Sequence, residues 1–480
     1  MIRFLLDLVE HQIEQLDPNA TVLTYLREQL GRTGTKEGCA SGDCGACTVV
    51  AVELIGEKLQ YRAINACITP LANLHGCQLL TVESLKQGNT LHPVQQAMVD
   101  CHGSQCGFCT PGIVMSLFAH RKSHVQPQPE ELLESLGGNL CRCTGYRPII
   151  AAGVQMYEPE AQDSFNADSD ATVATLTAIA QDTSDIFCQD NGRYYHAPTS
   201  AKGLADLLER HPKAKMVAGG TDLVLEITQN LRQFESLVYT GHVAELKQLH
   251  ETPDALHIGA AVSFSDARAS LCRYWPDLAE LIDRLGSLQI RNQGTLGGNV
   301  ANASPIGDMP PVLIALQATL VLQSNTGKRE LSIENFFLGY RKTALKQGEF
   351  IHSIVIPKPA TGDWFQAYKI SKRLEDDISA VCGAFYLRIE ADIVQEVSIA
   401  FGGMAEIPKR ATQVERVLAG QPWNEASIEV AITALSHDFT PISDFRASAE
   451  YRAQVAGNLL RRLLLAHTTP ASELRVTHHA

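Results

Sequence analysis

Residues 38–47 read Gly38-Cys39-Ala40-Ser41-Gly42-Asp43-Cys44-Gly45-Ala46-Cys47, which places three cysteines at the spacing C-x4-C-x2-C. A fourth cysteine, Cys67, follows after a further nineteen residues. The plant-type [2Fe–2S] arrangement has this form, because one loop supplies three thiolates and a nearby strand or turn supplies the fourth. The stretch therefore predicts a cluster-binding loop in the N-terminal part of the chain.

The residues around these cysteines fit a cluster loop. Gly38, Gly42 and Gly45 allow tight turns and let backbone N–H groups point at sulfur. The β-branched and apolar run 48–54 predicts a strand that leaves the loop. A zinc site, or unrelated buried cysteines, is the alternative, although zinc motifs commonly use two C-x2-C pairs.

A second group of four cysteines follows, made of one C-x2-C and one C-x1-C pair: Cys106, Cys109, Cys141 and Cys143. Both pairs precede predicted helices, the first with Thr110 as N-cap and Pro111 at the first helical position. Two helix N-termini would direct partial positive charge at an anionic cluster. From the spacing alone, a four-thiolate zinc site remains open.

Length and composition narrow the class of protein. The 480 residues suggest about three domains, and 45% apolar residues indicate globular domains. A net charge of −13 without a Lys/Arg block argues against nucleic acid as the main partner. The N-terminal run 2–6 is broken by Asp7 and Glu10 and is too short and too charged for a signal peptide, so we expect none. No stretch approaches the ~20 apolar residues of a membrane span. We therefore expect a reducing, cytoplasmic setting and no membrane partner.

Ten of the 13 cysteines lie between Cys39 and Cys143. In a reducing compartment, such a dense group indicates metal binding before disulfides. The cysteines outside the two groups of four are expected to be small buried hydrophobic side chains: Cys77, Cys101, Cys188, Cys272 and Cys382.

The second half of the chain contains two glycine-rich segments. In the first, the apolar residues 216–218 run into Gly219-Gly220-Thr221-Asp222, and in the second Gly294-Thr295-Leu296-Gly297-Gly298-Asn299 precedes Asp308. Free N–H groups in such turns could cradle a pyrophosphate. Neither segment reads G-x-G-x-x-G, so a Rossmann site is not indicated. Asp308 could equally be the N-cap of a helix.

Taken together, these motifs resemble the molybdenum hydroxylases over nearly the whole chain. Residues 38–47 with Cys67, CGFCTPG at 106–112 and NLCRCTGY at 139–146 are similar to the two-cluster iron–sulfur domain of that family. VAGGTDL, GTLGGNVANASPIGD and the segment from Lys369 to Ile378 are similar to its FAD domain. The tail from Ser379 resembles its C-terminal flavoprotein subdomain, including residues 401–404 and 444–446.

The resemblance implies an α+β multidomain fold. It assigns residues 1–76 to a β-grasp, ferredoxin-like domain and residues 77–157 to a helical domain with the second cluster. Residues 158–192, rich in Ala, Asp, Ser and Thr, are expected to be a linker with some helix near 171–180. Residues 193–370 would form an α+β FAD-binding domain of the vanillyl-alcohol-oxidase (PCMH-like) type, and residues 371–480 an α+β C-terminal flavoprotein subdomain.

The resemblance also implies the site residues. It favours a [2Fe–2S] cluster in each cysteine group: Cys39, Cys44, Cys47 and Cys67, then Cys106, Cys109, Cys141 and Cys143. The FAD pyrophosphate would lie against Met216, Val217, Ala218, Gly219, Gly220, Thr221, Asp222 and Leu223. The ribityl and diphosphate region would contact Thr295, Gly297, Gly298, Asn299 and Asp308, and the rest of FAD Ile351 and Lys369. Leu285 stands where the family often has an aromatic residue near the flavin, and Leu374 where a basic residue is common.

The function implied is that of an electron-transfer subunit without catalytic residues beyond the FAD ring. Its large partner would bind molybdopterin and oxidise hypoxanthine and xanthine to urate, in a heterotetramer with two copies of each chain. Electrons would pass through the Cys106 group, then the Cys39 group, to FAD and finally to NAD⁺. Two alternatives stay open: a related subunit for aldehydes or N-heterocycles, and a zinc-stabilised interaction protein without redox function.

Overall fold

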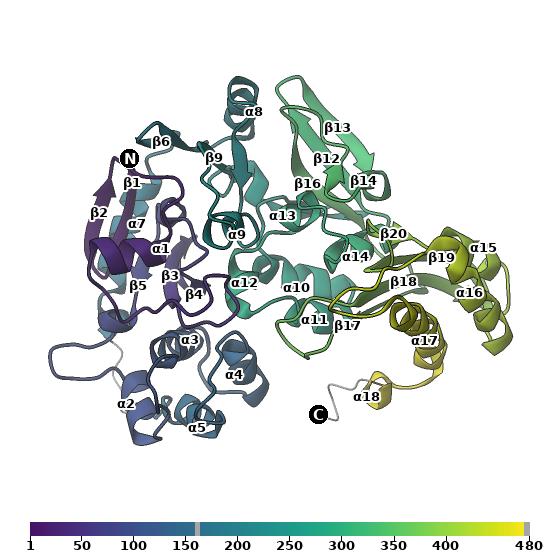
Figure 1. Ribbon diagram of the computed structural model, residues 1–480, viewed down its shortest axis with the longest axis horizontal. Helices are drawn as coiled ribbons and strands as arrows, with labels where there is room; N and C mark the ends of the chain where they lie inside the picture. Colours follow the sequence, from purple (N-terminus) through teal and green to yellow (C-terminus); the bar gives the residue numbers. More distant parts are fainter. Residues whose placement is uncertain (159–163, 475–480) are drawn as a thin grey trace. The chain divides into compact units, whose positions relative to one another are not determined.

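The computed structural model describes residues 1–158 and 164–474 (Figure 1). The chain divides into two compact units. Unit 1 contains Met1–Ala244, Ser263–Ser265 and Gly286–Thr295, and unit 2 contains Glu245–Val262, Asp266–Leu285 and the described residues from Leu296 onward. Residues 159–163 of the predicted linker and residues 475–480 of the predicted C-terminal subdomain lie outside the described residues.

Unit 1 begins with a mixed sheet in the order β2-β1-β5-β3-β4. Its strands are β1 (Ile2–Leu6), β2 (Val9–Ile13), β3 (Thr48–Ile55), β4 (Lys58–Asn65) and β5 (Gln78–Leu80). β1 pairs with β5 in parallel, whereas the hairpins β1-β2 and β3-β4 are antiparallel. The short helices α1 (Val22–Thr24) and η1 (Tyr25–Gln29) bury Leu23 and Leu26 against this sheet. Sheet and helix together match the predicted β-grasp layout.

Helices follow the first sheet. They are η2 (Leu71–Leu74), η3 (Val82–Ser84), α2 (Pro93–Asp100), α3 (Thr110–Ser123), α4 (Pro129–Leu136), α5 (Arg147–Gln155), α6 (Ser164–Ala167) and α7 (Ser169–Ala180). Helices α2 to α5 each carry proline at the first or second position. Proline is tolerated there because an N–H group in the first turn would have no acceptor within the helix. The predicted cap of α3 is wrong by one residue, since Cys109 is the N-cap and Thr110 the first helical residue. The helix therefore begins directly at a cysteine.

The rest of unit 1 is a second sheet in the order β6-β7-β9-β8. Its elements are β6 (Ile186–Asp190), β7 (Arg193–Ala197), α8 (Ala201–Arg210), β8 (Lys215–Val217), α9 (Leu223–Thr228), β9 (Ser236–Tyr239) and α12 (Leu288–Gln293). Buried residues of both sheets, such as Phe4 and Leu237, belong to one hydrophobic core. The predicted linker thus contains the helix α7 and the strand β6.

Unit 2 contains two antiparallel sheets, in the orders β10-β11-β16-β12-β13 and β17-β18-β19-β20. The strands are β10 (Leu249–Glu251), β11 (Ala255–Gly259), β12 (Thr319–Ser324), β13 (Gly327–Ser332), β16 (Phe350–Pro357), β17 (Asp363–Ile370), β18 (Val381–Glu390), β19 (Ile393–Gly402) and β20 (Lys409–Arg410). A separate small hairpin pairs β14 (Phe337–Gly339) with β15 (Lys342–Thr343).

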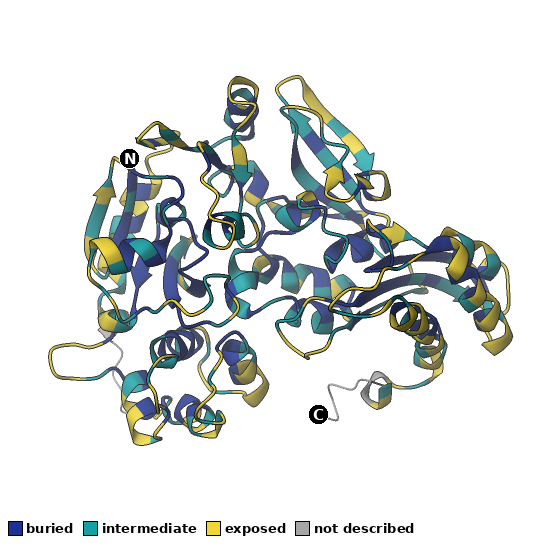
Figure 2. Cartoon of the chain, in the orientation of Figure 1, coloured by how far each residue is buried: buried dark blue, intermediate teal, exposed yellow. Residues whose placement is uncertain are grey.

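The helices of this half are η4 (Ala244–Lys247), α10 (Phe264–Tyr274), α11 (Leu278–Asp283), α13 (Leu296–Ala301), α14 (Met309–Ala315), η5 (Ile333–Asn335), α15 (Thr412–Leu418), α16 (Glu425–Asp438), α17 (Ala449–Thr468) and α18 (Ala471–Leu474). α16 and α17 share a core with β18 and β19, whose residues are buried along most of their length (Figure 2). The two units confirm an α+β multidomain fold. Across the described ranges, we find no helix with both the length and the apolar content of a membrane span.

Candidate functional site

The β3-β4 hairpin brings Cys47 and Cys67 together. Thr48 pairs with Asn65 at the open end of the hairpin, and Cys47 and Cys67 lie one and two residues beyond this pair. Their sulfur atoms are 3.3 Å apart, and the residues are only 1% and 2% exposed. Antiparallel pairing thus explains how a cysteine after a loop meets one twenty positions later in the sequence.

The loop before β3 holds the other two cysteines of this group. Its backbone has positive φ angles at Ala40, Gly42 and Gly45, a conformation that glycine adopts without strain. A Cβ atom on Gly38 would lie 2.7 Å from Cys44 Sγ, so no side chain fits there without movement. The amide of Asn65 donates to the carbonyl of Gly42 over 2.8 Å and ties the loop to the hairpin.

The four thiols of this first set interact directly. Hydrogen bonds from the thiols of Cys44 and then Cys67 lower the pKa of Cys39. The same contact with Cys39 raises the pKa of Cys44 and of Cys67, where burial adds to the increase. Four thiols in contact cannot all ionise unless a cation neutralises them. The set therefore fits a site in which the four cysteines bind iron as thiolate ligands.

The second set is assembled from the start of α3 and the loop before α5. Cys106 shares a hydrogen bond with Cys143, and Cys109 shares one with Cys141. Cys106 and Cys143 are exposed, whereas Cys109 and Cys141 are half-buried. The structure thus brings together all four cysteines of the second predicted set, with one pair facing solvent.

Ionisation within the second set differs between neighbours. A backbone N–H from Phe108 lowers the pKa of Cys106, whereas burial raises the pKa of Cys109 to about 12. Burial opposes ionisation of Cys141, but hydrogen bonds led by the Thr144 hydroxyl lower its pKa overall. The pKa of Cys143 is raised by its hydrogen bond to Cys106. As in the first set, full ionisation needs a bound cation.

In the described part of the chain, no three His, Cys, Asp or Glu side chains are arranged to hold a single metal ion. A [2Fe–2S] cluster instead shares its four thiolates between two irons. All 13 cysteines lie in the described residues and are free thiols. Of those outside the two sets, Cys77, Cys188 and Cys382 are buried, and Cys101 and Cys272 are partly buried.

The first glycine segment follows β8 and leads into α9. Gly220 has φ +82°, and a Cβ atom on Gly219 would lie 1.9 Å from the carbonyl oxygen of Gln293. Gly219 is therefore required by packing within unit 1. The predicted pyrophosphate contacts, residues 216–223, lie in unit 1 together with Thr295.

The second glycine segment contains α13 in unit 2. A Cβ atom on Gly297 would lie 2.4 Å from the Cβ of Ala260, and the Gly297 N–H donates to the Ala260 carbonyl over 3.2 Å. Gly298 and Asn299 follow in the same helix. Asn299 Oδ1 is buried and has no hydrogen-bond partner among the described residues. An unpaired buried oxygen of this kind fits a site whose ligand completes the hydrogen bonding.

The remaining predicted FAD contacts of unit 2 are buried. Asp308 stands at the N-cap position of α14, but its side chain makes no capping bond. Instead, its Oδ2 pairs with Lys369 Nζ at 2.5 Å, and its Oδ1 accepts from Ser379 at 2.5 Å. Ile351 is 5% and Leu285 is 9% exposed.

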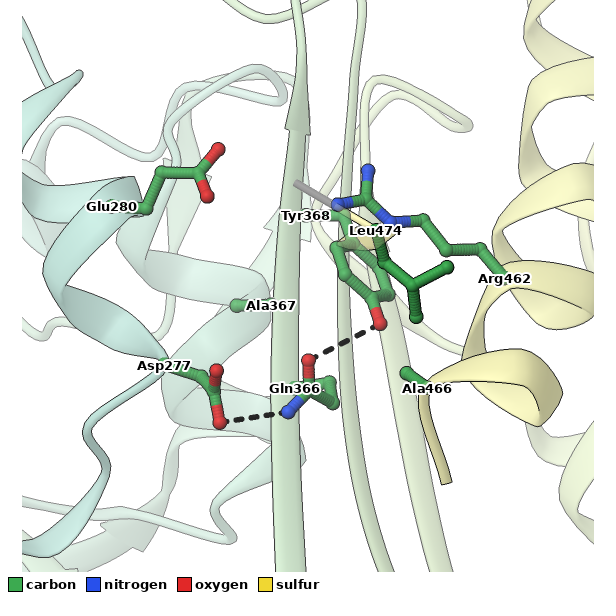
Figure 3. Close-up of a pocket in the computed structure, with 8 residues that line it drawn as sticks. All are labelled: Asp277, Glu280, Gln366, Ala367, Tyr368, Arg462, Ala466 and Leu474. Carbon is green, nitrogen blue, oxygen red and sulfur yellow. Dashed lines mark hydrogen bonds between the residues drawn. The ribbon is translucent and has the colours of Figure 1, made fainter. Parts of the chain in front are cut away.

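A small pocket within unit 2 contains none of the predicted site residues (Figure 3). It is lined by Asp277, Glu280, Gln366, Ala367, Tyr368, Arg462, Ala466 and Leu474. Gln366 donates to Asp277 over 2.7 Å and accepts from the Tyr368 hydroxyl over 3.2 Å. With a volume of ≈ 40 Å³, it is much smaller than the roughly 300 Å³ or more of ordinary ligand sites.

A hydrogen bond joins two buried amide side chains, Asn139 and Gln289, near the cysteine sets. Asn139 belongs to the NLCRCTGY motif, whereas Gln289 was not singled out. Gln289 is fully buried and donates to Asn139 Oδ1 over 3.0 Å. In the sequence, Gln289 is one glutamine in a short and partly apolar helical segment. This pattern does not distinguish a buried glutamine from one on the surface.

Four family comparisons cover most of the chain. Residues 6–72 match the 2Fe-2S iron-sulfur cluster binding domain, and residues 81–154 match the [2Fe-2S] binding domain. Residues 186–359 match the FAD binding domain in molybdopterin dehydrogenase, and residues 366–467 match the CO dehydrogenase flavoprotein C-terminal domain. These ranges do not fix where one domain ends, so the domain boundaries given above stay predictions.

Curated relatives include xanthine dehydrogenases. The protein from Emericella nidulans is 35% identical over 91% of this chain and 36% of its own length. Xanthine dehydrogenase/oxidase from Mus musculus is 33% identical over 88% of this chain and 35% of its own length. The chain therefore spans about a third of the length of the curated relatives it matches.

Solved structures are similar to somewhat more than half of the chain. A chain of carbon monoxide dehydrogenase from Hydrogenophaga pseudoflava is 30% identical with TM-score 0.54, covering 56% of this chain and 94% of that one. A chain of quinoline 2-oxidoreductase from Pseudomonas putida 86 is 27% identical with TM-score 0.53, covering 57% and 95%.

Two cysteine sets on iron–sulfur folds, followed by an FAD-binding fold, define an iron–sulfur flavoprotein of the oxidoreductase class. The chain belongs to the molybdenum hydroxylase family, and it carries that family's two [2Fe–2S] domains and its FAD-binding domain.

Proposed function

We propose that this chain is the electron-transfer subunit of a xanthine dehydrogenase. It would pass electrons from the molybdenum site of a partner subunit, which oxidises hypoxanthine and xanthine to urate, through two [2Fe–2S] clusters to FAD and then NAD⁺. The observation that carries the proposal is the assembly of eight cysteines into two separate sets of four. The identity to xanthine dehydrogenases over most of this chain supports the choice of enzyme.

The cysteines are proposed to hold the clusters as thiolates. Cys39, Cys44, Cys47 and Cys67 would hold one cluster, and Cys106, Cys109, Cys141 and Cys143 the other. When bound, the clusters would carry single electrons, and FAD would collect two of them and deliver the pair as a hydride. The chain's task is then to fix the thiolates and to exclude water from the first set, where Cys47 and Cys67 are buried.

Exposure supports the order of the two sets. Cys106 and Cys143 face solvent, and the residues that directly precede Cys109 and Cys141 in sequence, Phe108 and Leu140, expose apolar side chains. Apolar groups around an exposed redox site are typical of a surface that a partner covers. We therefore propose that the second set receives electrons from the molybdopterin-binding subunit, and that the first set passes them on.

Flavin binding is proposed for the residues implied by the resemblance. FAD would contact residues 216–223, Thr295, Gly297, Gly298, Asn299, Asp308, Ile351 and Lys369, with Leu285 near its ring. The unpaired Oδ1 of Asn299 supports this set. NAD⁺ as oxidant, a heterotetramer of two copies of each chain and a cytoplasmic setting belong to the same proposal.

A second candidate is the equivalent subunit of an enzyme for another substrate, such as an aldehyde or an N-heterocycle. The similarity of 57% of this chain to a chain of quinoline 2-oxidoreductase favours it. Substrate choice would then depend on the partner. The two candidates are separated by which compound, xanthine, an aldehyde or quinoline, reduces the flavin of the complex.

The cofactor proposal is tested with anaerobically purified chain. We expect about four iron atoms and matching inorganic sulfide per chain, bound FAD, and a paramagnetic signal after dithionite. NADH alone should bleach the flavin, and a molybdopterin-binding polypeptide should co-purify from the native host. A colourless protein with about two zinc ions per chain would instead establish the zinc-stabilised interaction protein and refute the redox function.

A further inference from the structure

A buried polar network joins the two loops that carry the cysteine sets. Asn139, two residues before Cys141, donates to the Gly45 carbonyl over 3.0 Å and to Thr48 Oγ1 over 3.2 Å. Gly45 lies between Cys44 and Cys47, and Thr48 follows Cys47 directly. One amide side chain from the loop that carries Cys141 therefore holds the loop that carries Cys44 and Cys47.

A main-chain contact runs parallel to this network. The N–H of Leu140 donates to the carbonyl of Cys44 over 3.0 Å, and Leu140 is bonded directly to Cys141. One hydrogen bond thus links the backbone of a ligand in the first set to that of a ligand in the second. The approach is close, because a Cβ atom on Gly45 would lie 2.2 Å from the carbonyl oxygen of Gly138.

Gln289 completes the network from a distant part of the sequence. It lies on α12, which packs against β4 in unit 1 (Figure 1). Its Nε2 lies 3.0 Å from Asn139 Oδ1, 3.1 Å from Ser116 Oγ and 3.3 Å from Thr48 Oγ1. Asn139 Oδ1 also accepts from Ser116 over 2.6 Å, so the Gln289 nitrogen supplies a second donor to the same oxygen.

We propose that Gln289 is a positioning residue for electron exchange between the two cysteine sets. It orients Asn139, and Asn139 in turn holds the Leu140–Cys44 hydrogen bond that connects them. Residues that hydrogen-bond to metal ligands commonly fix the geometry of those ligands and tune properties of the bound metal such as its redox potential. Because Gln289 belongs to the FAD-domain match at 186–359, this domain would set the coupling between centres held by the preceding domains. The inference rests on the proposed function, since it requires a cluster in each set.

The test replaces Gln289 by Leu, which keeps the bulk and removes the donor. Asn292→Leu is the matched control: Asn292 lies on the same helix and bonds Ala63 and Ser265, and neither residue belongs to a cysteine loop. Iron, sulfide and flavin are measured first. The magnetic interaction between the two dithionite-reduced clusters is then recorded by low-temperature EPR, and their electron exchange by rapid partial reduction.

We expect Q289L to keep its iron, sulfide and FAD, while the magnetic interaction weakens and intercluster exchange slows several-fold. N292L should behave like the unmodified protein. Unchanged coupling in Q289L would overturn the proposal. So would an equal change in both variants, because any loosening of α12 would then suffice.

A second variant tests the proposal if Q289L fails to fold or loses its iron. Ser116→Ala keeps Gln289 and removes one hydroxyl that lies between it and Asn139, so a smaller change in the same direction is expected. Coupling like that of the unmodified protein in S116A would then overturn the proposal. Unmodified protein without iron would refute the proposed function itself, a result distinct from each of these.

Discussion

Lys369 Nζ lies 2.5 Å from Asp308 Oδ2 inside unit 2, with the two residues 5% and 6% exposed. Ser379 donates to the other oxygen of the same carboxylate, so the charge on Asp308 is satisfied on both sides. The pair connects β17 to the start of α14. Both residues are also predicted FAD contacts.

Lys369→Met should lower the free energy of unfolding of unit 2 by about 3–5 kcal/mol, because it leaves a buried carboxylate without its cation. Urea unfolding followed by far-UV circular dichroism measures the loss. The double variant K369M/D308L should recover part of it, since no unpaired charge remains. A loss below about 1 kcal/mol, the value of an exposed pair, would contradict this account.

Cys143→Ser should remove iron from the second set and leave the first intact, because the first set shares no ligand with it. Iron analysis and EPR of the reduced protein should show half the iron and one remaining signal. Cys101→Ser is the control in the same region. Its thiol donates to Gln155 over 2.8 Å, a bond that serine can keep, so its iron content should be normal. Full iron in C143S would remove Cys143 from the ligands.

Asn299→Ala should weaken FAD binding without destabilising the flavin-free protein. Its Oδ1 bonds no group in the described residues, and an unsatisfied buried oxygen costs roughly 1–3 kcal/mol in the free state. Flavin content after gel filtration and the thermal midpoint of the flavin-free protein measure the two effects. A destabilised variant with normal FAD affinity would mean that Asn299 serves the fold alone.

Acid should destabilise the region around α3 through His120. Burial, together with the neighbouring His124, lowers the pKa of His120 to about 4, and neither ring nitrogen has a hydrogen-bond partner in the residues that the structure describes. The folded state therefore binds fewer protons than the unfolded state between about pH 4 and pH 6.5. Stability is full above this window and falls by up to roughly 3 kcal/mol as the pH drops through it.

His120→Phe should remove this part of the acid sensitivity, because the ring stacked on His124 is kept and no proton can bind. Unfolding midpoints at pH 7 and pH 4.5 measure the difference. His437→Phe, at an exposed position of α16, should leave the pH dependence unchanged. Equal pH dependence in H120F and the unmodified protein would show that His120 is not responsible.

Local spacing was enough to predict the cysteine sets and the strand that leaves the first loop. The run 48–54 was predicted as a strand, and β3 extends over Thr48–Ile55. The place of Cys67 follows once this strand pairs with its neighbour. These features depend on residues close in sequence, where glycine, cysteine and β-branched side chains have strong local preferences.

Features that depend on distant residues could not be predicted. Asp308 was considered as a helix cap, yet its carboxylate bonds Lys369, 61 positions away. Gln289 reaches Asn139 across 150 positions. The cap of α3 differs by one residue because Cys109, rather than Thr110, takes the position before the helix. For Asp308 and Gln289, long-range tertiary contacts outweigh any local preference.

The unequal burial of the two cysteine sets has a practical consequence for handling the protein. Dissolved oxygen and chelators reach Cys106 and Cys143 directly, whereas Cys47 and Cys67 are shielded by the hairpin. Thiolates in contact with solvent are oxidised first. In aged preparations, the second cysteine set should therefore lose its cluster before the first set does. Flavin and half the colour should then remain after the proposed ability to accept electrons from a partner is lost.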